Sequence, residues 1–228
     1  MASYLEIIPG IYQIGGARFS SSEDCCVYLI DGGGEYAVID CGAGKSAGKI
    51  FSNLSKIVKK LQGVRYLVLT HGHIDHIGGG QYLLEQMPHL EIVAHKLELP
   101  AIENGEERLT AANWYGVIYN GLPVNRVLRE QEETISVGKM KLHCLHTPGH
   151  TVGGISPYLD WQGKRILFGQ DIHGPFDSKW GSDLLVWRKS MEKLLALKAD
   201  ILCEGHYGIM ETPEDVEDFI QDFLRRYS

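Results

Sequence analysis

Four potential metal ligands stand within six residues, directly after an apolar run. The run covers Val64 to Leu69 and predicts a buried strand, and the side chains that follow it are those of His71, His73, Asp75 and His76. Imidazole nitrogen and carboxylate oxygen are ligands that a borderline cation such as Zn²⁺ accepts. Burying four such groups together carries a large desolvation cost unless something compensates them. The motif therefore predicts a fold in which this strand ends at a metal site.

Three glycines follow the motif, at positions 78 to 80. Because glycine has no Cβ, the backbone can turn tightly close to the cluster. The alternative interpretation is that these histidines are ordinary residues of a solvated loop. It accounts for one or two of them more easily than for four potential ligands beside a glycine turn, so we favour the metal site.

Three further potential ligands stand in similar settings. His150 follows a predicted strand and the turn Thr147-Pro148-Gly149, and His206 follows the apolar run Ile201 to Cys203. Asp171 comes after the predicted strand Arg165 to Phe168. Transitions from strand to loop are places where a rigid scaffold positions functional groups. A carboxylate such as Asp171 would alone be an ordinary turn residue, and only with the other six does it indicate a metal bridge.

In these residues the chain resembles the metallo-β-lactamase superfamily. The resemblance rests on the His-x-His-x-Asp-His motif and on the order and approximate spacing of His150, Asp171 and His206, and it covers nearly the whole chain. It implies an α+β fold, an αβ/βα four-layer sandwich of two mixed β-sheets with helices on both outer faces. The metal site would lie at one edge of the sandwich.

The resemblance also implies two divalent metal ions. It assigns the ligands as follows: His71, His73 and His150 to one ion, Asp75, His76 and His206 to the second, and Asp171 to both. Zinc is the expected metal, with iron and manganese as alternatives, since histidine and aspartate suit all three. Asp40, in Asp40-Cys41-Gly42, is expected to orient a ligand histidine.

Three positions can be compared with the pattern of the superfamily. Members commonly have glycine directly before the bridging aspartate, whereas Gln170 stands there in this chain. True β-lactamases usually have cysteine or serine at the bridge, so Asp171 favours a glyoxalase II-like or lactonase-like branch. The diiron flavoprotein oxidases of the family usually have glutamate where this chain has His73.

These residues predict a dinuclear metallohydrolase. Two metal ions ~3.5–4 Å apart can hold a water between them and lower its pKa towards ~7. Our hypothesis is that this bridging hydroxide cleaves a small-molecule thioester, ester or lactone. Asp75 is expected to orient the nucleophile as well as bind metal. His173 either assists proton transfer in the pocket or is an ordinary core or solvated histidine.

Other activities remain open. A phosphodiesterase or nuclease of the same superfamily is one alternative, and a mononuclear iron persulfide dioxygenase, which keeps a similar ligand motif, is another. A binding protein without turnover is disfavoured because all seven ligand positions are filled. The net charge of −7 argues against nucleic acid as a partner, because neutralising phosphates needs a surplus of Lys and Arg. We therefore expect a small-molecule substrate.

The composition, 44% hydrophobic and 22% charged, is that of a globular chain. The first residues show no signal-peptide pattern, and no run approaches the ~20 apolar residues that span a bilayer. Five cysteines without framework spacing suit a reducing compartment. We expect a cytoplasmic protein without a membrane partner, and the oligomeric state, a homodimer included, stays open.

We expect one domain over residues 1–228, with a partly helical insertion at about 96–126 that either covers the site or serves ordinary packing. Strands are expected over 7–14, 25–30, 36–39, 91–94 and 134–146, with a hairpin turn at 31–34. A helix is expected from Ile50 to Leu61, stopped by Gly63, and two more close the chain, at about 183–197 and from Thr212 onwards. His143 and His146 are expected to be structural.

Overall fold

The computed structural model describes residues 3–227 and contains two mixed β-sheets. The first sheet has the strand order β1-β2-β3-β4-β5-β6-β7, with β1 (Leu5–Ile8), β2 (Ile11–Gln13), β3 (Tyr28–Asp31), β4 (Tyr36–Ile39), β5 (Val64–Val68), β6 (Glu91–His95) and β7 (Arg126–Leu128). The second has the order β13-β12-β11-β10-β9-β8, with β8 (Glu132–Val137), β9 (Met140–His146), β10 (Ile155–Trp161), β11 (Lys164–Gln170), β12 (Ile201–Glu204) and β13 (Ile209–Met210).

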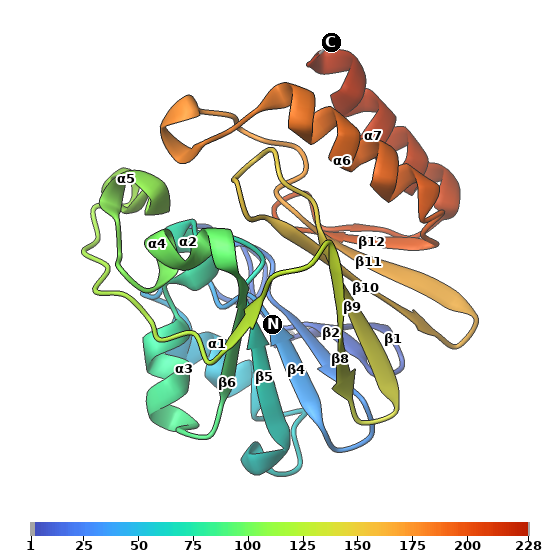
Figure 1. Ribbon diagram of the computed structural model, residues 1–228. Coiled ribbons are helices and arrows are strands. Elements are labelled where there is room, and N and C mark those ends of the chain that lie inside the picture. The colour runs from blue at the N-terminus through green and yellow to red at the C-terminus, as the bar shows by residue number, and fades with distance from the viewer. Residues whose placement is uncertain (1–2, 228) are drawn as a thin grey trace.

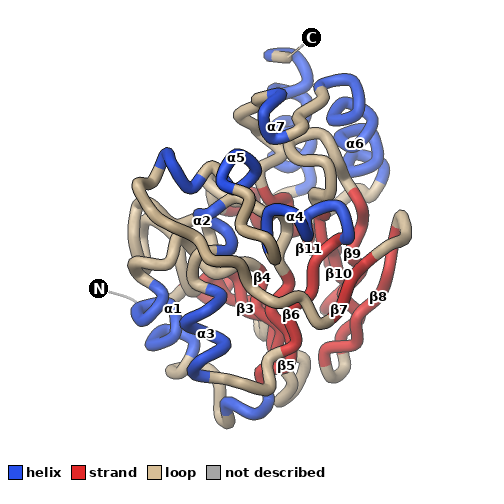
Figure 2. The backbone as a smooth tube through the Cα atoms, turned by 60° about the vertical axis from the view of Figure 1, so that its left-hand side comes forward, coloured by secondary structure: helices blue, strands red, loops and turns tan. Residues whose placement is uncertain are grey.

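Helices cover the outer faces of both sheets, as Figures 1 and 2 show. The α-helices are α1 (Ala47–Leu54), α2 (Ile74–Ile77), α3 (Gly80–Gln86), α4 (Leu99–Ile102), α5 (Glu107–Thr110), α6 (Leu184–Ala196) and α7 (Pro213–Arg226). Short 3₁₀ helices are η1 (Leu61–Gly63), η2 (Lys96–Glu98), η3 (Ala112–Trp114) and η4 (Ser178–Trp180). The predicted four-layer sandwich is confirmed.

Alternating side chains divide the apolar residues among three cores. In β3, Tyr28 and Ile30 face the core between the two sheets, while Leu29 points to the outer core beneath α1 and α3. In β11, Phe168 faces the central core and Leu167 the second outer core, beneath α6 and α7. Because successive side chains of a strand point to opposite faces, strands buried on both faces read as continuous apolar runs.

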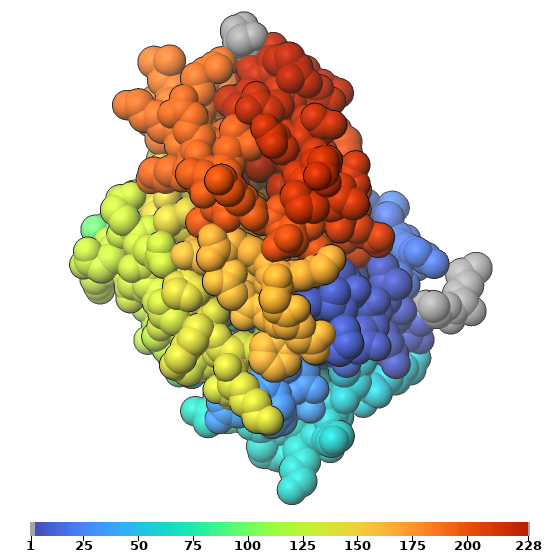
Figure 3. Space-filling view, turned by 90° about the vertical axis from the view of Figure 1, so that its right-hand side faces the viewer, coloured from blue at the N-terminus to red at the C-terminus, as the bar shows by residue number. Residues whose placement is uncertain are grey.

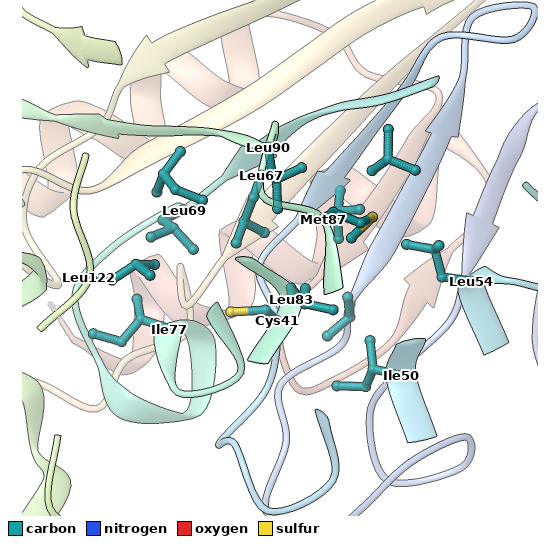
Figure 4. Close-up of a cluster of buried hydrophobic side chains, with 14 of the residues drawn as sticks. Cys41, Ile50, Leu54, Leu67, Leu69, Ile77, Leu83, Met87, Leu90 and Leu122 are labelled. Carbon is teal, nitrogen blue, oxygen red and sulfur yellow. The ribbon is translucent and has the colours of Figure 1, made fainter. Parts of the chain in front are cut away.

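The outer cores hold the helical layers in place. Figure 4 shows Ile50 and Leu54 of α1, and Leu83 of α3 with Met87, in one buried cluster with Leu67 of β5. Figure 3 shows the C-terminal part of the chain, in red, at the opposite end of that face from the cyan segment that contains α1.

The directions of the strands bring several loops to one edge. Strands β4 and β5 run parallel, and so do β11 and β12, while β9 and β11 are both antiparallel to β10. The carboxyl ends of β9, β11 and β12 therefore lie at one edge of the second sheet. The loops that carry the predicted ligands follow β5, β9, β11 and β12.

The strand predicted over residues 7–14 is wrong in one respect. It is a hairpin of β1 and β2, in which Ile8 pairs with Ile11 around Pro9-Gly10. Proline lacks an N–H for a ladder hydrogen bond, and Gly10 has a φ of 94°, a left-handed conformation that favours glycine. The hairpin predicted at Asp31 is confirmed, with Asp31 opposite Tyr36.

The helix predicted to run to Leu61 is also shorter than expected. It ends at Leu54, where both the hydroxyl and the N–H of Ser55 donate to the carbonyl of Phe51. The chain continues in turns that still place Ile57 and Val58 against the outer core. The apolar stripe therefore predicts the burial of these side chains correctly, but the helix length predicted from it is wrong. Gly63 lies in η1 rather than at a helix stop.

The closing helices agree with their predicted starts. Asp183 caps α6 by accepting hydrogen bonds from Leu185 and Val186, and Thr212 caps α7 by accepting one from Asp215. None of the helices within residues 3–227 combines the length and the apolar character needed to cross a membrane.

Candidate metal centre

The seven predicted ligands come together at the edge where the strands end. They form two groups whose ligand atoms lie within 4.8 Å of one another, and Asp171 belongs to both groups. The groups are His71, His73, His150 and Asp171, and Asp75, His76, His206 and Asp171. The short helix α2 places Asp75 and His76 on its first turn, directly after His73. The fold therefore brings the seven side chains into one cluster, in the two sets that the resemblance implies.

In the first group, imidazole nitrogens face each other. His150 Nε2 lies 3.0 Å from His73 Nδ1 and 3.7 Å from an Asp171 carboxylate oxygen. The ring of His71 lies 4.6 Å from that of His73 and 4.8 Å from that of His150. Three imidazoles and one carboxylate thus converge on one point, which is the donor set of a tetrahedral Zn²⁺ site.

In the second group, two carboxylates meet two imidazoles. His206 Nε2 lies 3.2 Å from Asp75 Oδ2 and 3.3 Å from Asp171 Oδ2. His76 Nε2 lies 3.1 Å from Asp171 Oδ1 and 3.6 Å from Asp75 Oδ2. His206 is the most exposed of these side chains, at 32%, so this group faces the solvent side of the cluster.

Several of these atoms have no hydrogen-bond partner although they are buried. Among the described residues, the unpartnered side-chain atoms include His71 Nε2, His76 Nε2 and Asp171 Oδ1. Buried polar atoms are nearly always satisfied, and an unsatisfied one calls for a ligand, water or ion. The donor set and these unpartnered atoms both fit bound divalent cations.

The electrostatics of the cluster also suit cations. Burial, together with the neighbouring His150, lowers the pKa of His73 to about 3, so its ring is neutral and free to bind a metal. Burial opposes charge on His206 as well, but Asp171 outweighs it and raises the pKa of His206 to about 10. Without metal, the carboxylates thus draw positive charge onto a histidine. A divalent ion would supply that charge.

Residues behind the ligands fix their orientation. Asp40, expected to orient a histidine, accepts a hydrogen bond from His76 Nδ1 at 2.7 Å and also contacts Thr70. The carbonyl of Pro175 accepts from His150 Nδ1 at 2.7 Å. Such contacts select the tautomer in which the other ring nitrogen is free to bind a metal.

A third group, of Cys25, Asp40 and His76, lies behind the second one. Burial raises the pKa of the Cys25 thiol, so the thiol stays protonated. Because the thiolate is the form that binds metal, this group is a poor site.

Sequence reasoning missed Glu204 as a functional residue. Its carboxylate is fully buried: Oε1 accepts from His173 Nδ1 at 2.6 Å, while Oε2 accepts from the N–H groups of His206 and Tyr207 at 2.7 and 2.9 Å. One side chain therefore orients both His173 and the loop of the ligand His206. A glutamate at the end of an apolar strand, two residues before a ligand, was the available signal.

A hollow of about 170 Å³ opens over the cluster. Its walls include four ligands, His173 and aromatic side chains: His73, Asp75, Ala111, Trp114, Tyr115, Asp171, His173, Pro175, Trp180 and His206. The ring of Trp180 lies 4.5 Å from that of His73 and 5.0 Å from that of Trp114. Figure 1 shows α5, in green, and the orange loop before α6 on the same side of the molecule.

Other candidates lie away from the hollow. Tyr119 donates to the carbonyl of Ile102, and Tyr207 packs against Phe223, so neither lines the hollow. His143 pairs with Glu132. Neither His143 nor His146 belongs to a metal-binding group of the described residues.

The position before Asp171 shows how the chain departs from the family pattern. Gln170 has a φ of 45°, a conformation in which glycine is favoured, and the β11–β12 register shifts beside it. The glycine common in the superfamily suits the same backbone. The departure at Gln170 therefore leaves Asp171 in place.

A family model described as the metallo-beta-lactamase superfamily matches residues 23–206, which include all seven ligands. The chain belongs to this superfamily. A metallo-beta-lactamase from Cronobacter sakazakii, a HARLDQ motif mutant, is 18% identical, with a TM-score of 0.83, and the match covers 100% of this chain and 96% of that one. At that identity the likeness shows the fold alone.

Two curated relatives fit a branch outside the true β-lactamases. A probable hydroxyacylglutathione hydrolase from Schizosaccharomyces pombe is 29% identical over 51% of this chain and 36% of its own length. An acyl-coenzyme A thioesterase from Gallus gallus is 26% identical over 72% of this chain and 62% of its own length. The chain thus spans less than two thirds of either relative. Membership in the superfamily supports a metal-dependent hydrolase.

Proposed function

We propose that this protein is a dinuclear metallohydrolase that cleaves a small-molecule thioester, with esters and lactones as related substrates. One observation carries the proposal: two groups of His and Asp ligands share the carboxylate of Asp171. The first ion would be held by His71, His73 and His150, the second by Asp75, His76 and His206, and both by Asp171. Zinc is the metal that this donor set suits best, since imidazole predominates.

The bound ions would supply Lewis-acid chemistry, polarising a carbonyl oxygen and lowering the pKa of a water. Asp75 lies on the hollow, and its carboxylate is oriented by His206 at 3.2 Å. Although burial acts in the opposite direction, the neighbouring His76 lowers the pKa of Asp75. Asp75 thus stays ionised and accepts a hydrogen bond from the attacking water, which it aims at the substrate.

We assign proton transfer to His173. Its Nδ1 is occupied by Glu204 at 2.6 Å, and its ring lines the hollow beside Asp171 and His206. The tautomer with Nδ1–H leaves Nε2 to exchange a proton with the bound substrate. A buried carboxylate that orients an imidazole in this way is a recurring arrangement of acid–base catalysis. His173 would take up at Nε2 the proton that the attacking water loses, and would then pass it to the leaving group.

The residues that line the hollow favour a substrate with a small acyl group. Trp114, Tyr115 and Trp180 offer an apolar surface next to the ligands. The covering role expected of residues 96–126 becomes part of this proposal, since Trp114 and Tyr115 belong to that segment. The names of the two relatives, a hydroxyacylglutathione hydrolase and an acyl-coenzyme A thioesterase, support an acyl thioester over an amide.

A phosphodiester is a weaker candidate. The described residues that line the hollow include no Lys or Arg. A neighbouring hollow, which shares Trp114 and Trp180, has Arg108 and Lys179, but Glu107 and Asp177 balance their charge. A phosphate diester would need a surplus of positive charge there.

The test is elemental analysis of the purified protein, beside hydrolysis of acyl thioesters, lactones and phosphodiesters. We expect close to two zinc, iron or manganese ions per chain, with turnover of thioesters. One iron per chain, with oxygen consumption on a glutathione persulfide and no hydrolysis, would replace the proposal by a dioxygenase. An Asp75→Ala variant with full activity and full metal content would refute the role of Asp75.

A further inference from the structure

Glu98 is a second buried carboxylate that the proposed mechanism does not use. It ends η2, and only 3% of the residue is exposed. Its Oε2 accepts the N–H of Gly72 at 2.8 Å, and its Oε1 accepts the N–H of Gly153 at 2.7 Å. One side chain therefore joins two backbone segments that are 81 residues apart in sequence (153 − 72).

Both segments carry ligands of the first group. Gly72 stands between His71 and His73, and Gly153 lies three residues after His150. The N–H of Gly72 lies in the peptide plane that joins it to His71, and His73 is the next residue, so a shift of this N–H displaces the backbone beside both histidines. Glu98 thus hydrogen-bonds to both loops that carry the imidazoles of the first group.

The two glycines leave room for this contact. A Cβ at Gly72 would lie 2.9 Å from Glu98 Oε2 and 2.4 Å from the Cβ of Ala101. A Cβ at Gly153 would lie 2.8 Å from Glu98 Cγ. No other residue type fits at Gly72 or Gly153 unless the surrounding atoms shift. The sequence therefore has glycine on each side of the carboxylate that joins the loops.

We propose that Glu98 is a positioning residue that fixes the loops of His71, His73 and His150 and thereby sets the metal affinity of the first group. The inference rests on the metal centre of the proposed function and not on its substrate. Among the described residues, no hydrogen bond joins Glu98 to Asp75, His76 or His206 of the second group.

A purely structural role explains Glu98 poorly. No Lys, Arg or His of residues 3–227 lies within salt-bridge distance of Glu98. Burial raises its pKa, while the Thr151 hydroxyl and the backbone N–H groups of Gly153 and Gly72 oppose the rise. A buried carboxylate without a cation is costly, and an apolar side chain of similar size would avoid the cost. A carboxylate is the side chain that accepts from two separate N–H groups at once.

The experiment compares metal affinity in Glu98→Gln and in the unaltered protein. A glutamine amide can accept one N–H, but its NH₂ would face the other N–H, donor against donor. We expect one of the two ions to bind 10–100-fold more weakly, measured by competition with a chromogenic chelator, because loss of a group that orients ligands has roughly this effect. The affinity for the second ion should change much less.

Glu103→Gln is the matched control. Glu103 lies in the same segment and accepts a backbone N–H, that of Val124 at 3.0 Å, but Val124 is not in a ligand loop and Glu103 is exposed. Both affinities should match those of the unaltered protein. Equal affinity at both sites in Glu98→Gln would overturn the inference and leave the proposed function intact, whereas an unaltered protein without tightly bound metal would overturn both.

Hydrogen exchange in the unaltered, metal-free protein tests the same contact without a variant. The amides of Gly72 and Gly153 should exchange slowly because their N–H groups are held by Glu98. Exchange as fast as that of exposed loop amides would show that the carboxylate does not hold the loops. This measurement decides the matter even if Glu98→Gln does not fold.

Discussion

The histidines in and beside the candidate metal centre differ in the group that holds one ring nitrogen. His76 donates to Asp40, His150 donates to the carbonyl of Pro175, and His173 donates to Glu204. Each contact determines which nitrogen is left for a metal or a substrate. The chemistry of each ring therefore depends on a residue at least 25 positions away in sequence.

His173→Gln separates proton delivery from metal binding. We expect kcat for an ester or lactone to fall by about 100-fold, the usual order for loss of a general acid. Thioester turnover should fall much less, because a thiolate with an ordinary pKa near ~8.5 leaves without a proton more readily than an alkoxide does. Metal content should stay unchanged, and the exposed His89→Gln is the control. An equal loss for both substrate classes would contradict the assigned role.

At the scale of elements, a pair of stacked histidines joins the two sheets. His95 ends β6 of the first sheet, His146 ends β9 of the second, and their ring centroids lie 4.0 Å apart. Burial and the facing His146 lower the pKa of His95 to about 4, and burial lowers the pKa of His146. Both rings are therefore neutral in the folded protein at pH values where the unfolded chain begins to take up protons.

This pair should make the fold sensitive to acid. Between the ordinary pKa of histidine, near ~6.5, and the folded value of about 4 for His95, the unfolded state binds more protons, so stability falls as pH falls. We expect His146→Gln to lessen this loss by on the order of 1 kcal/mol, measured by urea unfolding at pH 7 and pH 5. His89→Gln should leave the slope unchanged. A His146→Gln slope as steep as that of the unaltered protein would refute the coupling.

The cap of α7 is a local feature with a local effect. Thr212 accepts the N–H of Asp215 at 3.1 Å at the start of the helix. Thr212→Ala should lower the free energy of unfolding by about 1 kcal/mol. For a chain of this size the Tm should fall by about 3 °C, read by circular dichroism. Thr212→Ser should restore the Tm, and metal content should match that of the unaltered protein in both. An unchanged Tm in Thr212→Ala would show that the cap contributes nothing.

In the whole molecule, the candidate metal ligands come from both halves of the sandwich. His71, His73, Asp75 and His76 follow β5 of the first sheet, whereas His150, Asp171 and His206 follow strands of the second. Ions held between them would cross-link the sheets at one edge. Their removal leaves buried carboxylates and imidazoles without compensation.

Chelation of the metal should therefore destabilise the whole fold. With free metal at 1,000 times its Kd, binding contributes about 4 kcal/mol. The Tm should fall by about 10 °C in EDTA and return when zinc is restored. Asp171→Ala, which lacks the shared ligand, is the control and should lose most of this response. An EDTA-insensitive Tm in the unaltered protein would contradict a stabilising centre.

Local patterns in the sequence predict the features that depend on neighbouring residues. The His-x-His-x-Asp-His motif after Val64–Leu69 predicted the ligands, apolar runs predicted doubly buried strands, and Asp183 and Thr212 marked the starts of α6 and α7. These features depend on residues within a few positions of one another, through hydrogen bonds of one turn or the alternation of one strand. Pro9-Gly10 is a local signal of the same kind, since it marks the turn between β1 and β2.

The packing of the two sheets determines which residues, distant in sequence, form hydrogen bonds with the buried polar atoms. Glu98 accepts from Gly72 and Gly153, and Glu204 accepts from His173, although nothing near either glutamate indicates its partner. Backbone N–H groups are present at nearly every residue, so a carboxylate that binds them produces no pattern in sequence. The early end of α1 has a related cause, since Ile57 and Val58 reach the core through turns as well as they would from a helix. The pattern of apolar residues in the sequence predicts which side chains are buried. The hydrogen-bond partner of a buried polar atom depends instead on how the two sheets pack together.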